Sequence, residues 1–232
     1  MFVVEGIRAT EELAKSSLRV VGGLVSPQLA STPRGAELRA SLAARDVEIA
    51  DVSDTEFESA AETETPQGIL MIAATPERAL RHFASARPAR YLVLDAVQDP
   101  GNVGTLLRTA AALGATATVA LPGTVDLWNA KVVRSAMGAH FEHPAVHCTW
   151  DELRLFLAEA SVPLWAGDAD GSVAQRQSAP ERLALAVGNE GSGLSPHVRG
   201  AAERVVSLPL ANGVESLNVA VAAGILLYEL RP

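Results

Sequence analysis

Three polar, glycine-containing segments in the second half of the chain have residue types that suit ligand binding. They span Asp99–Arg108, Gly188–Leu194 and Glu215–Val219. Each follows an apolar run that is typical of a buried strand, or leads into an apolar helix. Ligands of α/β proteins occupy the crevice at the carboxyl ends of the strands, so the three segments predict one shared site.

In the first segment, Asn102 is expected to cap the helix that follows, which leaves early backbone N–H groups available to an anion. The helical repeat places an apolar stripe on one side and puts Gly104 and Arg108 on the other. A planar guanidinium beside a residue without a side chain suits a phosphate or a carboxylate. The alternative is a surface arginine next to a turn glycine.

The second segment has the G-x-x-x-x-G spacing of a phosphate-binding loop, from Gly188 to Gly193. Leu194 stands where that loop requires lysine, which argues against a nucleoside triphosphatase. A glycine-rich bend after a buried strand still exposes backbone groups to a flat ligand such as adenine. Glu190 inside it can accept hydrogen bonds or face a cation, although a loop that only turns a corner is the alternative.

In the third segment, Ser216 is expected to cap a final helix over 216–229. That helix is apolar nearly all round, which predicts burial. Asn218 lies at its mouth and needs hydrogen-bond partners, because a buried amide without them costs free energy. This segment taken alone favours a purely structural cap.

The elements that must position these segments are predicted as alternating strands and helices. Strands separated by helices imply right-handed crossovers and a mostly parallel sheet, hence an α/β fold. Strands are expected over 91–94, 118–121, 163–166, 183–187 and 205–208, and helices near 103–113, 128–136, 151–160 and 216–229.

The first 75 residues predict a separate small α/β domain. Residues 76–90 are interpreted as a linker with a short helix, and 91–232 as the main domain. Within the small domain, strands are expected over 20–25, 47–49 and 69–73, and helices over 11–17 and 34–45.

Composition limits the classes of protein. The 232 residues are 48% hydrophobic and 20% charged, which is typical of a globular chain with an ample core. No apolar run approaches the roughly 18 to 20 residues that cross a bilayer, and the start lacks the pattern of a secretory signal. The single cysteine, Cys148, excludes an internal disulfide and fits a reducing cytoplasm.

Charge does not by itself indicate a nucleic-acid partner. Nineteen basic residues against 27 acidic ones give a net charge of −8, whereas nucleic-acid-binding domains are usually basic. The only clearly basic stretch is the expected linker, with Arg78, Arg81, Arg87 and Arg90. Binding of RNA must therefore be argued from the site.

Two other classes of site are not expected. His140, His143, His147 and Cys148 resemble a metal cluster, but Pro144 interrupts any helix that would align them and the spacing matches no standard zinc pattern. We therefore predict no metal. The chain also lacks the G-x-S-x-G elbow of many serine hydrolases and the G-x-G-x-x-G fingerprint of dinucleotide-binding domains.

The ordered set of motifs resembles the SpoU/TrmH family of RNA ribose 2′-O-methyltransferases. The order is Asn-x-Gly-x-x-x-Arg, then Gly-Asn-Glu-Gly-x-Gly-Leu, then Ser-Leu-Asn-Val before an apolar C-terminal helix. The resemblance covers about 91–232 and includes Lys131–Arg134. Residues 1–75 are similar to the family's ribosomal-protein-like substrate-binding domain, through Phe2–Gly6 and Thr65–Gly68.

The resemblance implies a SPOUT fold with a C-terminal trefoil knot, S-adenosylmethionine bound in the knot, and a homodimer that completes each site. It also implies an RNA substrate, and the extra N-terminal domain favours ribosomal RNA over tRNA by analogy. No membrane partner is expected, because the chain lacks a long apolar run. Carried over position by position, the cofactor-binding residues are Gly188, Glu190, Gly191, Leu208, Leu217 and Asn218. The catalytic residue is Arg108, supported by Asn102, Glu190, Ser216 and Asn218.

The chemistry expected of such a site is methyl transfer from a sulfonium to a ribose hydroxyl. Because arginine stays protonated, Arg108 is a poor general base and is expected to hold an RNA phosphate and orient the hydroxyl. Methylation of tRNA is one alternative, and a non-catalytic RNA-binding or assembly protein is another.

Two features depart from the family pattern. Related chains usually carry a basic stretch before the Phe2–Gly6 run, so either this sequence starts late or the protein docks RNA with less positive charge. Ser135-Ala136 also inverts the family's Ala-Ser order after Arg134.

Overall fold

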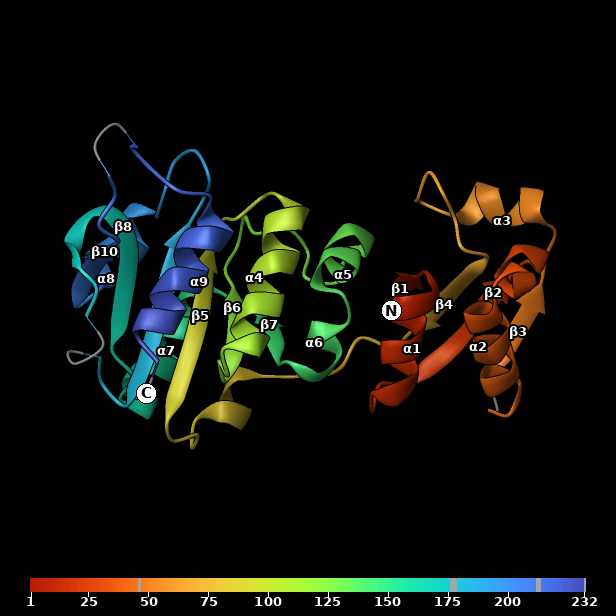
Figure 1. Ribbon diagram of the computed structural model, residues 1–232. Coiled ribbons are helices and arrows are strands. Elements are labelled where there is room, and N and C mark those ends of the chain that lie inside the picture. The colour runs from red at the N-terminus through yellow and green to blue at the C-terminus, as the bar shows by residue number, and fades with distance from the viewer. Residues whose placement is uncertain (46, 176–178, 212–213, 232) are drawn as a thin grey trace. The chain divides into compact units, whose positions relative to one another are not determined.

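A computed structural model describes residues 1–45, 47–175, 179–211 and 214–231. It divides into two compact units, Met1–Glu77 with Trp128–Glu142, and Arg78–Leu127 with His143–Pro232 (Figure 1). The domain boundaries at 75 and 90 stay a prediction. The structure adds that Trp128–Glu142 packs with the N-terminal residues.

The N-terminal unit contains a four-stranded sheet in the order β1-β4-β2-β3. β4 is antiparallel to both β1 and β2, and β3 lies parallel to β2. The predicted strands 20–25 and 69–73 are confirmed to the residue, whereas β1 was not expected. The bounds are Phe2–Glu5 for β1, Val20–Val25 for β2, Glu48–Asp51 for β3 and Ile69–Ala73 for β4.

Helices α1 (Ile7–Lys15) and α2 (Pro33–Ala43) confirm the two helices expected in this unit. A further helix, α3 (Asp54–Ala60), was missed in the acidic stretch that begins at residue 53. Its signal was the capping box, in which the Ser53 side chain and Glu56 bond each other's backbone N–H.

Two short helices, α5 (Ala130–Ala136) and α6 (Ala139–Glu142), complete the N-terminal unit. Aromatic side chains join them to β1: the Phe2 ring centroid lies 4.4 Å from Trp128 and 5.9 Å from Phe141. Burial of these rings explains why the segment belongs to this unit.

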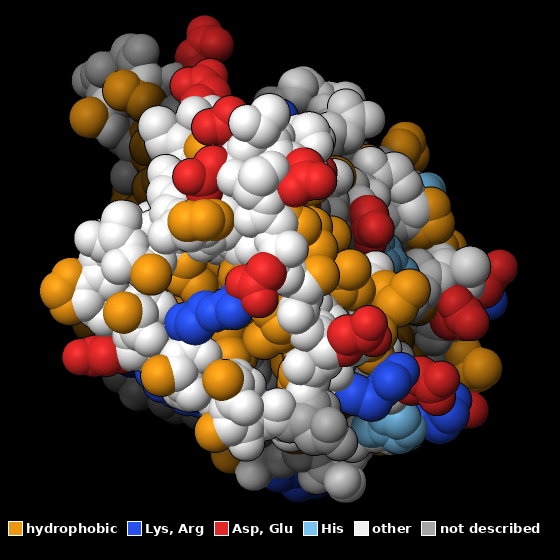
Figure 2. All heavy atoms as spheres, turned by 90° about the vertical axis from the view of Figure 1, so that its right-hand side faces the viewer, with side chains coloured by type: hydrophobic (Ala, Val, Ile, Leu, Met, Phe, Trp, Pro, Cys, Tyr) orange, Lys and Arg blue, Asp and Glu red, His pale blue; other side chains and the backbone are white. Residues whose placement is uncertain are grey.

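Several basic side chains of this unit are paired with acidic ones. Arg34 forms an ion pair with Glu11, and Arg39 Nη2 lies 2.6 Å from Asp51 Oδ1. Asp and Glu side chains are spread over the face shown in Figure 2, where Lys and Arg side chains stand singly or beside them. Net charge therefore does not mark this face as an RNA interface.

The second unit contains a six-stranded sheet in the order β10-β8-β9-β5-β6-β7, and its described strand pairs are all parallel. The α/β class and the parallel sheet are thus confirmed, while the trefoil knot stays a prediction. The short strand β7 was not expected. The bounds are Ala89–Asp95 for β5, Ala117–Ala120 for β6, Ala145–His147 for β7, Leu164–Val173 for β8, Arg182–Gly188 for β9 and Arg204–Ser207 for β10.

Helices α4 (Pro100–Ala112) and α9 (Val219–Glu229) lie side by side against this sheet (Figure 1). A Cβ atom at Gly224 would lie 3.1 Å from Thr109 Cγ2, so the glycine lets the two helices approach closely. In the described part of the chain, no helix is long and apolar enough to cross a membrane.

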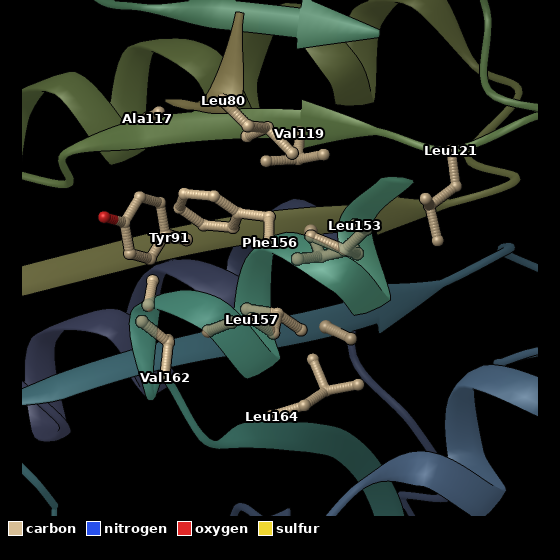
Figure 3. Packing of buried hydrophobic residues seen from close by; sticks show 14 of the residues in the cluster. Leu80, Tyr91, Ala117, Val119, Leu121, Leu153, Phe156, Leu157, Val162 and Leu164 are labelled. Atoms are coloured by element: carbon tan, nitrogen blue, oxygen red, sulfur yellow. The ribbon is translucent and has the colours of Figure 1, made fainter. Parts of the chain in front are cut away.

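Helix α7 (Trp150–Ala160) contributes several side chains to the hydrophobic core shown in Figure 3. The Phe156 ring meets Tyr91 edge to face, with centroids 5.3 Å apart. The Tyr91 hydroxyl donates to the Phe83 carbonyl at 2.6 Å, which satisfies the one polar atom of this buried ring. A short helix that was not predicted, α8 (Pro196–Ala201), follows β9.

The basic stretch serves the fold in part. Arg90 is buried, and its guanidinium donates to the carbonyls of Leu230 at 2.6 Å and Glu181 at 2.9 Å. Arg78 donates to the His143 carbonyl at 2.8 Å. These two arginines thus donate hydrogen bonds to backbone carbonyls within the second unit.

The four residues that resemble a metal cluster lie in different surroundings. His140 packs on Trp128, His143 bonds Thr118 Oγ1 at 2.9 Å, and His147 accepts from the Leu127 N–H at 3.1 Å. Burial raises the pKa of Cys148 to about 12. Among the described residues, no group of three or more His, Cys, Asp or Glu side chains could hold a metal.

His143 should make stability depend on pH. Burial, with the nearby charge of Arg78, lowers its pKa from 6.5 to about 4, so the unfolded chain binds a proton more readily than the folded one. The free energy of unfolding should therefore fall by about 1 kcal/mol per pH unit between pH 6.5 and 4 on account of this residue.

Urea unfolding of the wild type and His143→Gln across this range measures that contribution. The variant cannot take up the proton, so its stability should fall less steeply as the pH is lowered. Parallel curves would contradict the assignment.

Candidate active site

A pocket of about 520 Å³ opens where β9 and β10 end and α9 begins, and the middle of β8 also lines it. Because the strands are parallel, their carboxyl ends meet at one edge of the sheet, as the sequence predicted. All six residues predicted to bind a cofactor line it, and so does Ser216. These residues are Gly188, Glu190, Gly191, Leu208, Leu217 and Asn218.

The loop after β9 is closed by a pair of backbone hydrogen bonds between Asn189 and Gly193, at 2.9 and 3.0 Å. Gly188 lies against this closure, and a Cβ atom there would come within 2.2 Å of the Gly193 carbonyl carbon. Gly193 itself has a φ of 69°, in the left-handed region that favours glycine. The glycines therefore allow the loop to close on itself.

Asn189 is an organising residue that the sequence analysis did not single out. Its amide nitrogen donates to the Ala96 carbonyl at 2.9 Å. Its Oδ1 accepts from the backbone N–H groups of Gly191 at 2.9 Å and Ser192 at 3.0 Å. An asparagine before a glycine-rich bend is a sequence signal for such a turn.

A chain of side-chain hydrogen bonds joins the three polar segments. Asn218 Nδ2 donates to Asn102 Oδ1 at 2.9 Å, and Asn102 Nδ2 donates to Glu190 Oε1 at 2.9 Å. One residue comes from each segment, although they are far apart in sequence. The structure thus brings together the three polar side chains that the motifs share.

The helix caps differ from the prediction. Helix α4 begins at Pro100, and its cap is Asp99, whose carboxylate accepts from the Asn102 N–H at 2.7 Å. Proline suits the first helical position because it needs no N–H partner there. Asn102 is therefore inside the helix, and its amide is available to Glu190.

The cap of α9 is Asn218 and not Ser216, because the helix begins at Val219. Asn218 Oδ1 accepts from the backbone N–H groups of Ala220 at 2.9 Å and Val221 at 3.3 Å. Its Nδ2 remains for Asn102, so one amide ends the helix and holds the site. The expectation that Asn218 needs partners is confirmed.

The carboxylate of Glu190 is held from the loop that precedes α4. Besides Asn102, it accepts from the N–H groups of Gln98 at 3.3 Å and Asp99 at 3.2 Å. Burial raises the pKa of Glu190, but these hydrogen bonds outweigh it and leave that pKa below its usual value. Glu190 is thus a charged acceptor that ties two loops together.

Arg108 lies two turns along α4 from Asn102 and is exposed. The described residues that line the pocket do not include it. Gly104, one turn before Arg108 on the same helix, is buried, whereas Arg108 is exposed. The predicted apolar stripe is buried at Val103, Leu106, Leu107 and Ala110.

A second contact that the sequence did not indicate ties the far end of the β9 loop to β5. The buried carboxylate of Asp95 accepts from the Ser195 N–H and from its hydroxyl, each at 2.6 Å. Asp95 thereby fixes the residue at which the loop passes into α8.

Comparison with known proteins finds a matching family model for each part of the chain. The SpoU rRNA Methylase family model matches residues 89–228, and an MRM3-like substrate binding domain matches residues 1–71. The chain is 38% identical over 234 residues to the 23S rRNA (guanosine(2553)-2′-O)-methyltransferase RlmP of Bacillus subtilis. The alignment covers 99% of this chain and 88% of that protein.

A relative from Danio rerio, rRNA methyltransferase 3A, mitochondrial, is 32% identical over 72% of this chain, which spans half of that protein's length (50%). Among solved structures, the SpoU methyltransferase AviRb from Streptomyces viridochromogenes, in complex with the cofactor AdoMet, aligns with a TM-score of 0.87 at 26% identity. The alignment covers 99% of this chain and 88% of that one.

The close approach at Gly188 should make this position intolerant of a side chain. In Gly188→Ala the new methyl would meet backbone atoms of the loop closure, so the free energy of unfolding should fall by about 2 kcal/mol or more. Gly191→Ala is the matched control, because its Cβ would lie an ordinary 3.6 Å from Asn189 Oδ1. Urea unfolding measures both, and equal stability would contradict the loop geometry.

Proposed function

The chain belongs to the SpoU rRNA methylase family, and on that basis we propose that it transfers a methyl group from S-adenosylmethionine to a ribose 2′-hydroxyl of ribosomal RNA. The observation that carries the proposal is the family match over 89–228, which includes every strand and loop that lines the pocket. We place the reaction in the cytoplasm, by analogy with the bacterial relative.

The pocket fits a nucleoside cofactor. Its volume of about 520 Å³ is within the range of small-molecule sites, roughly 300 to 1,000 Å³. Leu208 and Leu217 offer apolar surface to a base, and the backbone of the Gly188–Gly193 loop offers polar groups. We propose that these residues hold S-adenosylmethionine, with Asn102 and Ser216 beside them, and that a trefoil knot surrounds the site.

When bound, S-adenosylmethionine supplies a methyl group that its positive sulfur already activates. The chain must then place the ribose hydroxyl and remove its proton. Arg108 is exposed on α4 and stays protonated, so its role is to bind an RNA phosphate and thereby orient the neighbouring hydroxyl. A phosphate oxygen would accept the hydroxyl proton as the new O–CH₃ bond forms and the bond between that methyl carbon and the sulfur breaks.

The polar chain from Asn218 through Asn102 to Glu190 supports this reaction by fixing α4 against the pocket. Two of its bonds are 2.9 Å long, and it joins the helix that bears Arg108 to the loop that lines the cofactor site. Truncation of Asn102 would leave both Asn218 and Glu190 without their shared partner. We therefore assign these residues a positioning role.

We also propose that the protein is a homodimer. Helix α9 was expected to be wholly buried, yet Val221, Ile225 and Tyr228 are 50%, 40% and 51% exposed in the single chain. Their spacing places them on one face of the helix. An exposed apolar stripe beside α4, which bears Arg108, suits a second copy that covers the stripe and completes the site.

The kind of RNA that is methylated, and whether any is methylated, distinguishes the proposal from its alternatives. Purified protein with radiolabelled S-adenosylmethionine should methylate ribosomal RNA, and mapping of 2′-O-methyl groups should give one ribose. Methylation of tRNA alone would favour a tRNA methyltransferase. Binding of RNA without methyl transfer would favour an assembly protein.

Loss of Arg108 should abolish transfer while it leaves the cofactor site intact. Arg108→Ala should lower the rate of methylation about 100-fold or more, with the Kd for S-adenosylmethionine nearly unchanged. Arg154→Ala, on the exposed side of α7, is the control and should retain activity. Full activity of Arg108→Ala would overturn the role.

A charge in the α9 stripe should separate the dimer. Ile225→Glu should sediment as a monomer in analytical ultracentrifugation, because a carboxylate cannot be buried in an apolar interface without large cost. Leu155→Glu, at a residue 60% exposed on α7, is the matched control and should stay dimeric. A dimeric Ile225→Glu would place the interface elsewhere.

A further inference from the structure

One carboxylate in the pocket is not accounted for by the motifs. The described lining residues include two carboxylates, Glu190 and Asp168, and no lysine or arginine. Glu190 is already engaged by Asn102 and by two backbone N–H groups. Asp168 belongs to β8, outside all three polar segments, and its neighbours Gly167 and Ala169 also line the pocket.

The side chain of Asp168 is held in one orientation. Its Oδ1 accepts from the Ala169 N–H at 2.7 Å, and its Oδ2 accepts from the guanidinium of Arg199 on α8. Arg199 is fixed in turn by Asp170, whose two oxygens lie 2.8 and 2.6 Å from its Nη2. The guanidinium therefore donates through Nη1 to Asp168 and through Nη2 to Asp170, and these two contacts together set its direction.

The same contacts decide which ligand group Asp168 can take. Each carboxylate oxygen has two lone pairs, so one on each oxygen remains for a ligand. Arg199 is shared between Asp168 and Asp170, so Asp168 remains a charged acceptor. One free lone pair on each of two neighbouring oxygens suits a pair of neighbouring hydroxyl donors.

We propose that Asp168 binds the ribose hydroxyls of S-adenosylmethionine, with Arg199 as the residue that positions it. The proposal rests on the proposed function, because it needs the cofactor in this pocket. In this arrangement β8 binds the two neighbouring ribose hydroxyls of the cofactor, while the glycine loop and the start of α9 bind the other parts of the cofactor. Asp170 acts only through Arg199, since it is not among the described residues that line the pocket.

A cycle of protein and ligand changes tests the assignment. Calorimetry would compare S-adenosylhomocysteine with its 2′-deoxy and 3′-deoxy analogues, each on the wild type and on Asp168→Ala. The variant should bind S-adenosylhomocysteine about tenfold or more weakly, because it loses hydrogen bonds to a charged acceptor. It should bind at least one of the deoxy analogues almost as well as the wild type does, since the lost partner is already missing there.

Two further variants separate ligand binding from a change in the fold. Asp168→Asn keeps the shape of the side chain but has one acceptor oxygen, so its affinity should be intermediate. Asp170→Asn keeps Asp168 in the pocket and should change the affinity less than about threefold, because Asp170 acts only through Arg199. Thermal unfolding of each variant reports whether it folds.

The outcomes are distinct. Equal weakening of all three ligands by both Asp168 variants, or no weakening, would overturn the ribose assignment and leave the methyltransferase proposal standing. Failure of the wild type to bind S-adenosylhomocysteine, together with absence of methyl transfer, would overturn the proposed function and the ribose assignment with it.

Discussion

The hydrogen-bond chain from Asn218 through Asn102 to Glu190 is the constraint on which the active site depends. It fixes the start of α9, the first turn of α4 and the loop after β9 in one arrangement. Its two outer members also serve the backbone, since Asn218 caps its helix and Glu190 holds the N–H groups of Gln98 and Asp99. Because one set of side chains serves both the fold and the pocket, a change in it affects both.

Several arginines of this chain hydrogen-bond groups of the protein itself, whereas a basic RNA-binding surface would present them to phosphates. Arg90 and Arg78 bind backbone carbonyls inside the second unit, and Arg199 is committed to Asp168 and Asp170. Affinity for RNA that comes from many phosphate contacts depends strongly on salt. A chain with a net charge of −8 must rely more on a few placed cations and on shape.

The sequence predicted the elements that have a strong repeat and the motifs that have a fixed order. The parallel strands 91–94 and 183–187, and the apolar stripe of α4, depend on burial along a whole element, which periodicity records. The caps were assigned wrongly because a cap depends on where a helix starts. The observed caps, Asp99 before Pro100 and Asn218 before Val219, lie only a few residues from the predicted ones. Asp168 was missed because its role depends on Arg199, 31 residues later, and no local pattern joins them.

The parallel sheet explains why parts that are so distant in sequence can share one pocket. β8, β9 and β10 run in the same direction, so each delivers its following residues to the same edge. The glycine loop provides backbone at that edge, α9 closes it with Asn218, and β8 adds a fixed carboxylate. Arg108, however, is outside the pocket lining of its own chain, on the helix that packs beside the exposed stripe of α9. The pocket proposed for the methyl donor and the arginine proposed to orient the acceptor are thus separate in one copy, and the apolar stripe offers the surface through which the proposed second copy would unite them.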